Sequence, residues 1–451
     1  MGNAPLYLSQ VSTANGVTAF FYIFACIGVM FDLFALTLLD AGTVQPYNVV
    51  DTVTQKLISA MIGGLSFLLI GYGVWNWQFY QALGIPHPLS QAIADWWIGG
   101  PNLNSFAQRL DPKDVPGADA QQVFAVFFCV FGAVTAGFVH SAGVERMKPV
   151  PCYILSAIAG GVMAPVLTYL TYGSASILTN AGLHDCVGVF ALYIFVGIWA
   201  LILAHRLGPR LRRSAAPPNV MAFISGVFLL LVGIPMLVVG SGYLRLEQGY
   251  FGISMVGSGL GVIFMNVFVA FAAGTIGGAV IAYRLKTPIY ALLGPISGYV
   301  ACSPLFDIAV IWQVALIALF APFVTLACGT CVSRMGIDEP KIAALALGPG
   351  IYGALAAGIV GAGVPTGGFF DLKTGPYAFQ HAHISFAMQC TGVIVVAAIS
   401  LISGFIFIPL LDKLLGLRVD RATELVGLDA SYWSPAPARS DLASSSAQRD
   451  A

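Results

Sequence analysis

The chain has 451 residues, of which 58% are hydrophobic and only 9% are charged. Soluble domains carry roughly a quarter of charged residues, so this composition excludes an ordinary soluble protein and indicates a chain with many membrane spans. The formal net charge is zero, which argues against a nucleic-acid partner. Glycine is frequent, at 51 residues, and small residues allow transmembrane helices to approach one another closely.

Eleven apolar segments follow one another along the chain, and a helix of about 20 apolar residues is enough to cross a bilayer. They predict an all-α polytopic protein of the cell membrane, with a transmembrane domain over residues 1–412 and a tail over 413–451. The connection at 78–120 holds Trp96 and Trp97, which suit a membrane interface. The tail ends in a Ser/Ala-rich run that predicts disorder. The expected spans cover approximately residues 18–40, 53–76, 121–142, 151–172, 185–205, 219–240, 252–283, 287–304, 308–333, 340–363 and 384–411.

The fifth span is oriented by its flanks, because Asp185 precedes it and the basic loop GPRLRRS follows it. Lys and Arg are enriched in cytoplasmic loops, so the loops that are poor in these residues are expected to lie outside. An odd number of spans then predicts an outer N-terminus and an inner C-terminus. The basic residues assigned to the outer loops are Arg109, Lys113, Arg245 and Lys373.

The eight cysteines show no spacing typical of a disulfide framework. Cys328 and Cys331 form a C-x-x-C pattern, but it lies inside an apolar segment, where small buried thiols are ordinary. The sequence also lacks the motifs of a nucleophile elbow, a metal-ligand cluster or a nucleotide loop. An enzyme, a cofactor and a bound metal are therefore not expected.

Asp32 lies near the middle of the first apolar segment, and Asp32, Leu36 and Asp40 share one helix face at the spacing i, i+4, i+8. An ionised carboxylate inside a bilayer costs at least about 3 kcal/mol, so Asp32 should face a cavity or a partner. One interpretation is a cation site in the lumen, and the other is a structural carboxyl that is either protonated or hydrogen-bonded to a neighbouring helix. His140 is expected to pack between helices, although a pair with Asp32 would supply a proton relay.

Five stretches resemble motifs of the ammonium transporter / methylammonium permease / Rhesus family. They occur in the family's order over about residues 20–430, and this order carries the resemblance more than any one motif. The stretches are DAGTVQPYNVVDTV at 40–53, VERMK at 144–148, KTPIYALLGPISGYVACSP at 286–304, MGID at 335–338 and GLDAS at 427–431.

The resemblance implies a homotrimer in which each protomer has eleven helices and its own narrow pore. Helices one to five and six to ten would form an inverted repeat, followed by a long eleventh helix, and a cytoplasmic regulator is a possible partner. At the outer mouth, Phe131 matches a gate phenylalanine, Leu237 replaces a second one, Tyr172 stands where many members have tryptophan, and Ser241 matches a recruiting serine. Asp185 matches the acidic residue that orders the vestibule, and it is also expected to cap the following helix.

The family's two pore histidines are replaced here, by Tyr193 at the first position and Leu347 at the second. Neutral imidazole can relay a proton near pH 7, whereas a phenol with a pKa of about 10 and a leucine cannot. The resemblance thus implies transport of ammonium or methylammonium by another mechanism. Two alternatives remain open: a pore re-tooled for a larger organic amine cation, with Leu237 widening the gate and Asp32 binding the cation, and a non-conducting ammonium sensor.

Overall fold

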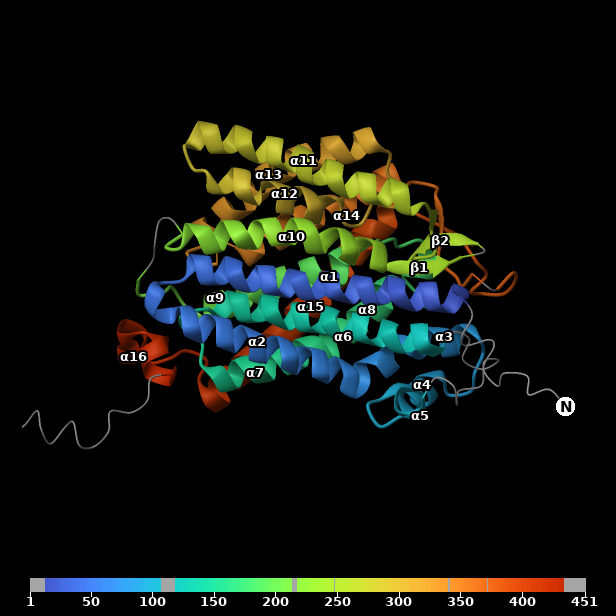
Figure 1. Cartoon of the computed structure of the whole chain (residues 1–451), viewed down its shortest axis with the longest axis horizontal. Coiled ribbons are helices and arrows are strands. Elements are labelled where there is room, and N and C mark those ends of the chain that lie inside the picture. Colours follow the sequence, from blue (N-terminus) through green and yellow to red (C-terminus); the bar gives the residue numbers. More distant parts are fainter. Residues whose placement is uncertain are drawn as a thin grey trace, which may run out of the picture.

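The computed structural model describes residues 13–106, 118–212, 217–246, 248–339, 341–370 and 372–433. Long helices lie side by side along one axis in this part of the chain (Figure 1). The start of α1 lies at the same end of the bundle as β1 and β2, and α16 lies at the other (Figure 1). We call these the sheet end and the α16 end. Some residues used in the predictions lie outside the described part of the chain. They are Arg109, Lys113 and the Ser/Ala-rich run of the tail.

Ten helical stretches in the described residues are long and apolar enough to cross a membrane, which confirms the predicted multi-pass membrane protein. The expected eighth span corresponds to α12, which is apolar but only 14 residues long. The count of eleven spans, their orientation and the boundary at residue 412 therefore stay predictions. The helices that form the spans are α1 (Thr13–Thr43), α2 (Val49–Ser66), α3 (Tyr72–Ala82), α6 (Ala118–Gly143), α7 (Pro149–Ile158), α8 (Ala164–Tyr172), α9 (Phe195–Leu207), α10 (Val220–Gly240), α11 (Leu260–Leu285), α12 (Ile289–Cys302), α13 (Ile311–Arg334), α14 (Gly348–Val360) and α15 (Phe386–Leu415).

Four of the spans contain a wide π-helical turn, in which one extra residue is accommodated. The first two join α2 to α3 and α7 to α8, and the others open the spans that continue as α9 and α14. Each such turn shifts the helix faces that residue counting would assign. The turns are η2 (Phe67–Gly71), η4 (Ala159–Met163), η6 (Val189–Ile194) and η7 (Ala343–Leu347).

Short strands cover the sheet end of the bundle. β1 (Gly242–Arg245) pairs with β2 (Gly249–Gly252), β2 pairs with β3 (Gly257–Ser258), and β4 (Pro365–Thr366) pairs with β5 (Ala382–His383), all antiparallel. The prediction that a span begins at residue 252 is wrong, because the apolar stretch there forms strands and α11 begins at Leu260. The smaller elements are η1 (Pro46–Asn48), α4 (Pro88–Trp96), α5 (Pro101–Asn104), η5 (Thr179–Ala181), α16 (Arg421–Val426) and η8 (Asp429–Trp433).

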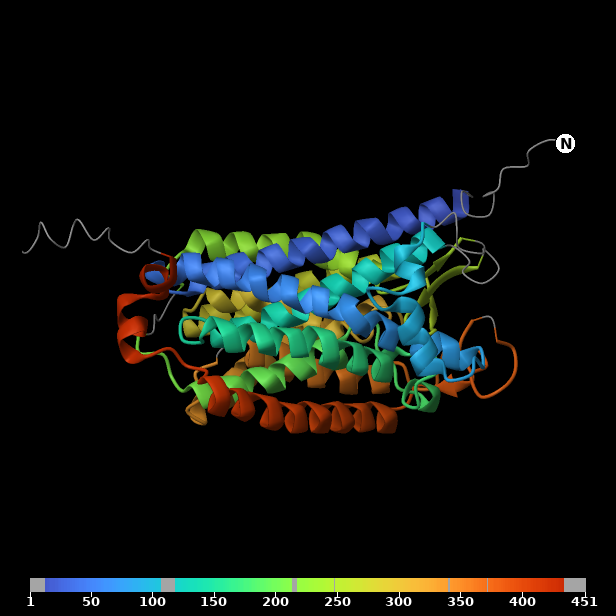
Figure 2. The same cartoon turned by 90° about the horizontal axis from the view of Figure 1, so that it is seen from below.

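Glycines allow the helices to pack closely at two crossings. In α10, a Cβ added at Gly226 would meet the α1 backbone, and one added at Gly233 would meet the Asp32 carboxylate. In α11 and α12, a Cβ at Gly274 would meet the carbonyl oxygen of Gly294, and the reverse also holds. Small residues at such crossings are typical of membrane helices. Figure 2 shows the long α15 along the flank of the bundle opposite α1.

Candidate functional site

A narrow cavity of about 110 Å³ lies inside the bundle. Its walls come from α1, α6, η6, α10, α12, η7 and the two residues that precede η7, and most of the lining side chains are apolar. The shared helix face predicted on α1 is confirmed, because Asp32, Leu36 and Asp40 all line this cavity. The polar or charged lining residues are Asp32, Asp40, Thr43, Ser141, Tyr193, Tyr299 and Lys341.

Asp32 is 4% exposed, and neither of its carboxylate oxygens has a hydrogen-bond partner among the described residues. The carboxylate faces α10 at Gly233, where the missing side chain leaves room for it. Among the described residues, Asp32 thus makes no hydrogen bond to a neighbouring helix, which contradicts the hydrogen-bonded form of the structural interpretation and leaves the protonated form open. A buried acceptor without a partner is costly, so this carboxylate is a strong candidate for contact with a ligand or a proton.

Tyr193 lies in η6, lines the cavity and donates a hydrogen bond from its hydroxyl to that of Tyr299, at 2.9 Å. The two rings meet edge to face with their centroids 6.0 Å apart. Leu347, the other residue predicted to replace a pore histidine, does not line the cavity. It packs against Gly197 of α9, and its neighbours Leu345 and Ala346 line the cavity instead.

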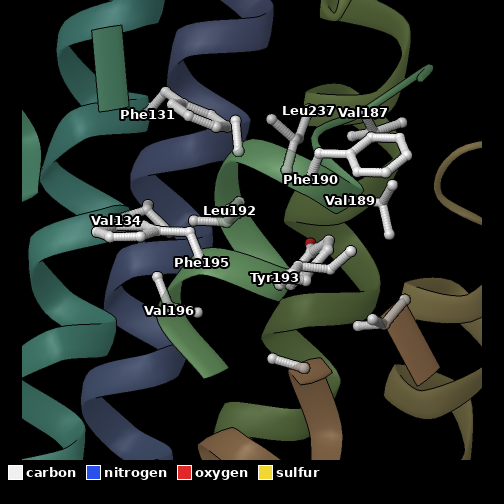
Figure 3. Close-up of a cluster of buried hydrophobic side chains, with 14 of the residues drawn as sticks. Phe131, Val134, Val187, Val189, Phe190, Leu192, Tyr193, Phe195, Val196 and Leu237 are labelled. Atoms are coloured by element: carbon white, nitrogen blue, oxygen red, sulfur yellow. The ribbon is translucent and has the colours of Figure 1, made fainter. Parts of the chain in front are cut away.

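At the sheet end of the cavity, Phe131 from α6 and Leu237 from α10 belong to the wall. Figure 3 shows both side chains on the same side of Leu192 and Tyr193. Phe131 approaches Tyr172 across Gly188, where an added Cβ would lie 2.6 Å from the Tyr172 hydroxyl and 3.3 Å from the Phe131 ring. Gly188 has a φ of +114°, so a side chain there would also be strained.

Two further residues expected at the outer mouth, Ser241 and Asp185, are buried outside the cavity lining. Ser241 donates its hydroxyl hydrogen to the Leu237 carbonyl at 2.8 Å, and it is the C-cap residue that follows α10. Asp185 accepts hydrogen bonds from the backbone N–H groups of Val187, Gly188 and Phe190, at 3.3, 3.0 and 3.1 Å. The helix cap predicted for Asp185 is therefore confirmed.

His140 does not meet Asp32. It is buried and lines a separate small cavity between α2, α6 and α7, together with Asp51, Gln55 and Cys152. His140 lies nine residues after Phe131, so it faces away from the wall of α6 that Phe131 and Val134 supply. The structure thus does not support an Asp32–His140 relay.

A charged cluster closes the α16 end of the cavity. The Asp40 carboxylate accepts hydrogen bonds from both Lys56 and Lys341, the latter at 2.7 Å. Lys56 also donates to the hydroxyl of Ser141 at 2.6 Å, and Lys341 donates to that of Thr43 at 2.9 Å. We call these five residues the floor cluster.

A second charged network lies outside the spans at the α16 end. Arg146 donates to the Asp338 carboxylate at 2.9 Å, and Arg210 bonds both Asp338, at 3.0 Å, and Glu145, at 3.1 Å. Burial alone would raise the pKa of Asp338, but hydrogen bonds from Arg210 and the charges of Arg210 and Arg146 hold that pKa well below its usual range. Two stretches that carry the resemblance, 144–148 and 335–338, therefore meet in space.

Comparison with known proteins now decides the family. A model of the Ammonium Transporter Family matches residues 19–435. The chain belongs to this family. The predicted resemblance is thereby confirmed, and the family is one of membrane transporters rather than enzymes.

Individual members of the Ammonium Transporter Family resemble the chain over nearly its whole length. Ammonium transporter Amt1 of Methanocaldococcus jannaschii is 25% identical over 434 residues, covering 94% of this chain and 97% of that protein. A solved structure of a sensor Amt protein superposes with a TM-score of 0.75 at 20% identity, over 93% of this chain and 99% of that one. Mep2 of Candida albicans gives a TM-score of 0.70 at 18% identity, over 93% and 89%. The two structures support the fold.

Several residues in and near this site were not predicted from the sequence. Lys56 could have been found, since a lysine inside an apolar span is as unusual as Asp32. Lys341 lies in a polar connection, where a lysine is unremarkable. Asp307, which bonds the buried His184 at 3.0 Å near the sheet end, gave no signal because it borders a span. Tyr299 is one of 17 tyrosines, and only the fold places it beside Tyr193.

Proposed function

We propose that this member of the Ammonium Transporter Family moves ammonium or methylammonium through the central cavity, with Asp32 as the group that binds the cation. The observation that carries the proposal is the buried Asp32 carboxylate, which lines the cavity and has no partner among the described residues. An ammonium ion donates hydrogen bonds to carboxylate oxygens and neutralises their charge, so it satisfies both needs of this group.

The wall between the sheet end and Asp32 suits a small cation. Phe131 offers an aromatic ring, whose face attracts a cation, and Leu237 opposes it with an apolar side chain. Below them the hydroxyl groups of Tyr193 and Tyr299 provide hydrogen-bonding groups in an otherwise apolar cavity. A carboxylate can hold the cation or accept its proton. In this way Asp32 takes over the role that the family resemblance assigns to two pore histidines.

The assembly around this pore belongs to the same proposal. The family resemblance supports eleven spans in inverted repeats, an outer N-terminus, an inner C-terminus and a homotrimer in which each protomer conducts. A soluble regulator would bind at the α16 end. There the tail reaches α2, because the Asp429 carboxylate accepts hydrogen bonds from the backbone N–H groups of Val50 and Asp51, at 3.1 and 2.7 Å.

The proposal is tested by transport measurements on purified protein in liposomes. Ammonium, methylammonium and trimethylammonium are applied in turn, and both the current on a solid-supported membrane and the uptake of labelled methylammonium are recorded. The key variant is Asp32→Asn. Asp119→Asn is the matched control, because Asp119 is an exposed acid at the start of α6 that does not line the cavity.

We expect uptake of ammonium and methylammonium by the wild type and by Asp119→Asn, and a loss of at least about tenfold in Asp32→Asn, equivalent to 1.4 kcal/mol. Transport of trimethylammonium alone would favour the re-tooled pore. Binding of ammonium without any transport would favour the sensor. Wild-type uptake in Asp32→Asn would refute the role given to this carboxylate.

A further inference from the structure

The floor cluster contains two lysine side chains for a single carboxylate, although one would neutralise it. Lys56 is 0% exposed and is held by Asp40, Ser141 and, more weakly, the Leu36 carbonyl at 3.5 Å. It is therefore the permanent counter-ion of Asp40. The second ammonium group, that of Lys341, is not needed for charge neutrality within the cluster.

Lys341 differs from Lys56 in its surroundings. Its side chain is 19% exposed, and it lies in the connection between α13 and η7 rather than within a span. It also lines two cavities: the central one, and a larger one of about 480 Å³ at the α16 end, whose wall includes Glu145 and Arg210. Lys341 thus stands between the central cavity and the space at the α16 end.

The ammonium group of Lys341 has the chemistry of the proposed solute. It donates to the Asp40 carboxylate at 2.7 Å and to the Thr43 hydroxyl at 2.9 Å, as a free primary ammonium ion would. Asp40 lies eight residues after Asp32 on the same face of α1, which is roughly 12 Å along the helix axis. A cation bound at Asp32 that travels toward the α16 end therefore meets Asp40 next.

We propose that Asp40 is a second site for ammonium or a primary amine cation, and that Lys341 occupies it as a tethered competitor which the solute must displace. This inference rests on the proposed function. While Lys341 is bound, the floor cluster carries a net positive charge and repels a cation. When Lys341 turns into the cavity at the α16 end, Asp40 and Lys56 form a neutral pair, and one carboxylate oxygen is left for the solute.

The test is a titration of the purified full-length protein with methylammonium, in which the melting temperature of the protein reports binding. Lys341→Met removes the competitor, and Lys341→Arg keeps both its charge and its reach. Lys413→Met is the matched control, since Lys413 is an exposed lysine at the α16 end of α15 that lines neither cavity. Each variant is measured with Asp32 intact and with Asp32→Asn. Thr43→Val loosens the same ammonium group without removing its charge and serves if Lys341→Met does not fold.

We expect Lys341→Met to lower the apparent Kd for methylammonium about tenfold or more, because a competitor that fills the site most of the time is removed. Thr43→Val should lower it less, and Lys341→Arg and Lys413→Met should not lower it. The gain should persist with Asp32→Asn, since the site that is freed belongs to Asp40.

An unchanged Kd in Lys341→Met would overturn the inference. A gain that disappears with Asp32→Asn would also overturn it, because the lost charge would then act only on Asp32. Uptake of labelled methylammonium separates this result from a failure of the proposed function. Uptake by the wild type with no gain in Lys341→Met removes the second site alone, whereas an absence of both binding and uptake removes both proposals.

Discussion

Asp40→Asn should be among the most destabilising substitutions in the chain. The change keeps the shape of the side chain but removes the charge that neutralises Lys56, which is 0% exposed. Breaking a buried ion pair from one side costs about 3–5 kcal/mol, because the remaining charge stays buried without compensation. Lys56→Met removes the other partner, but Asp40 then keeps Lys341 at 2.7 Å. Its cost should therefore be smaller, at about 2 kcal/mol or less.

Thermal unfolding in detergent, at one detergent concentration and one heating rate, compares the variants, and unfolding in increasing dodecyl sulfate supplies a second scale. The double variant Asp40→Asn with Lys56→Met should recover much of the loss, because no uncompensated buried charge remains. Equal losses in the two single variants would refute the asymmetry. A double variant as unstable as Asp40→Asn would show that the cost arises from packing instead of charge.

Three further outcomes are expected. Gly274→Leu should lower the melting temperature, at a cost of about 1–3 kcal/mol, because its side chain meets the α12 backbone, whereas Gly261→Leu in the same helix has nothing within 4 Å and should not. Tyr193→Phe leaves the Tyr299 hydroxyl without its partner, so it should cost about 1–3 kcal/mol and lower methylammonium uptake; unchanged uptake would contradict the place given to this hydroxyl in the cavity wall. The folded-state pKa of Asp338 lies below its ordinary value of about 4, so its carboxylate contributes stability above about pH 4 that is lost as the pH falls further. In Asp338→Asn, the melting temperature should fall less steeply as the pH is lowered below about 4. A fall as steep as in the wild type would contradict the ion-pair network.

Patterns within one helix were predictable from the sequence. The cavity face of α1 follows from the spacing of Asp32, Leu36 and Asp40, since a regular helix fixes which residues share a face. The cap by Asp185 follows from its position before an apolar run. Both inferences need only local geometry, and both are confirmed.

Expectations that depended on register or on contacts between helices fared differently. Leu347 was assigned to the pore by counting residues from 336–338, and the wide turn η7 breaks that count. The Asp32–His140 pair is not formed. No sequence pattern shows which face of α6 is turned toward α1, so the pair could not be judged from the sequence. The floor cluster joins α1, α2, α6 and a connection nearly 300 residues away, so only the folded chain brings its members together.

The wide turns give this architecture a way to alter the pore without touching its framework. Gain or loss of one residue at η6 or η7 would rotate the adjoining part of the span by about 100° relative to the rest of the bundle. A new set of side chains would then face the lumen in a single genetic step. Small insertions and deletions at these turns are therefore a route to altered solute selectivity, and libraries built on them would explore pore chemistries that point substitutions do not reach.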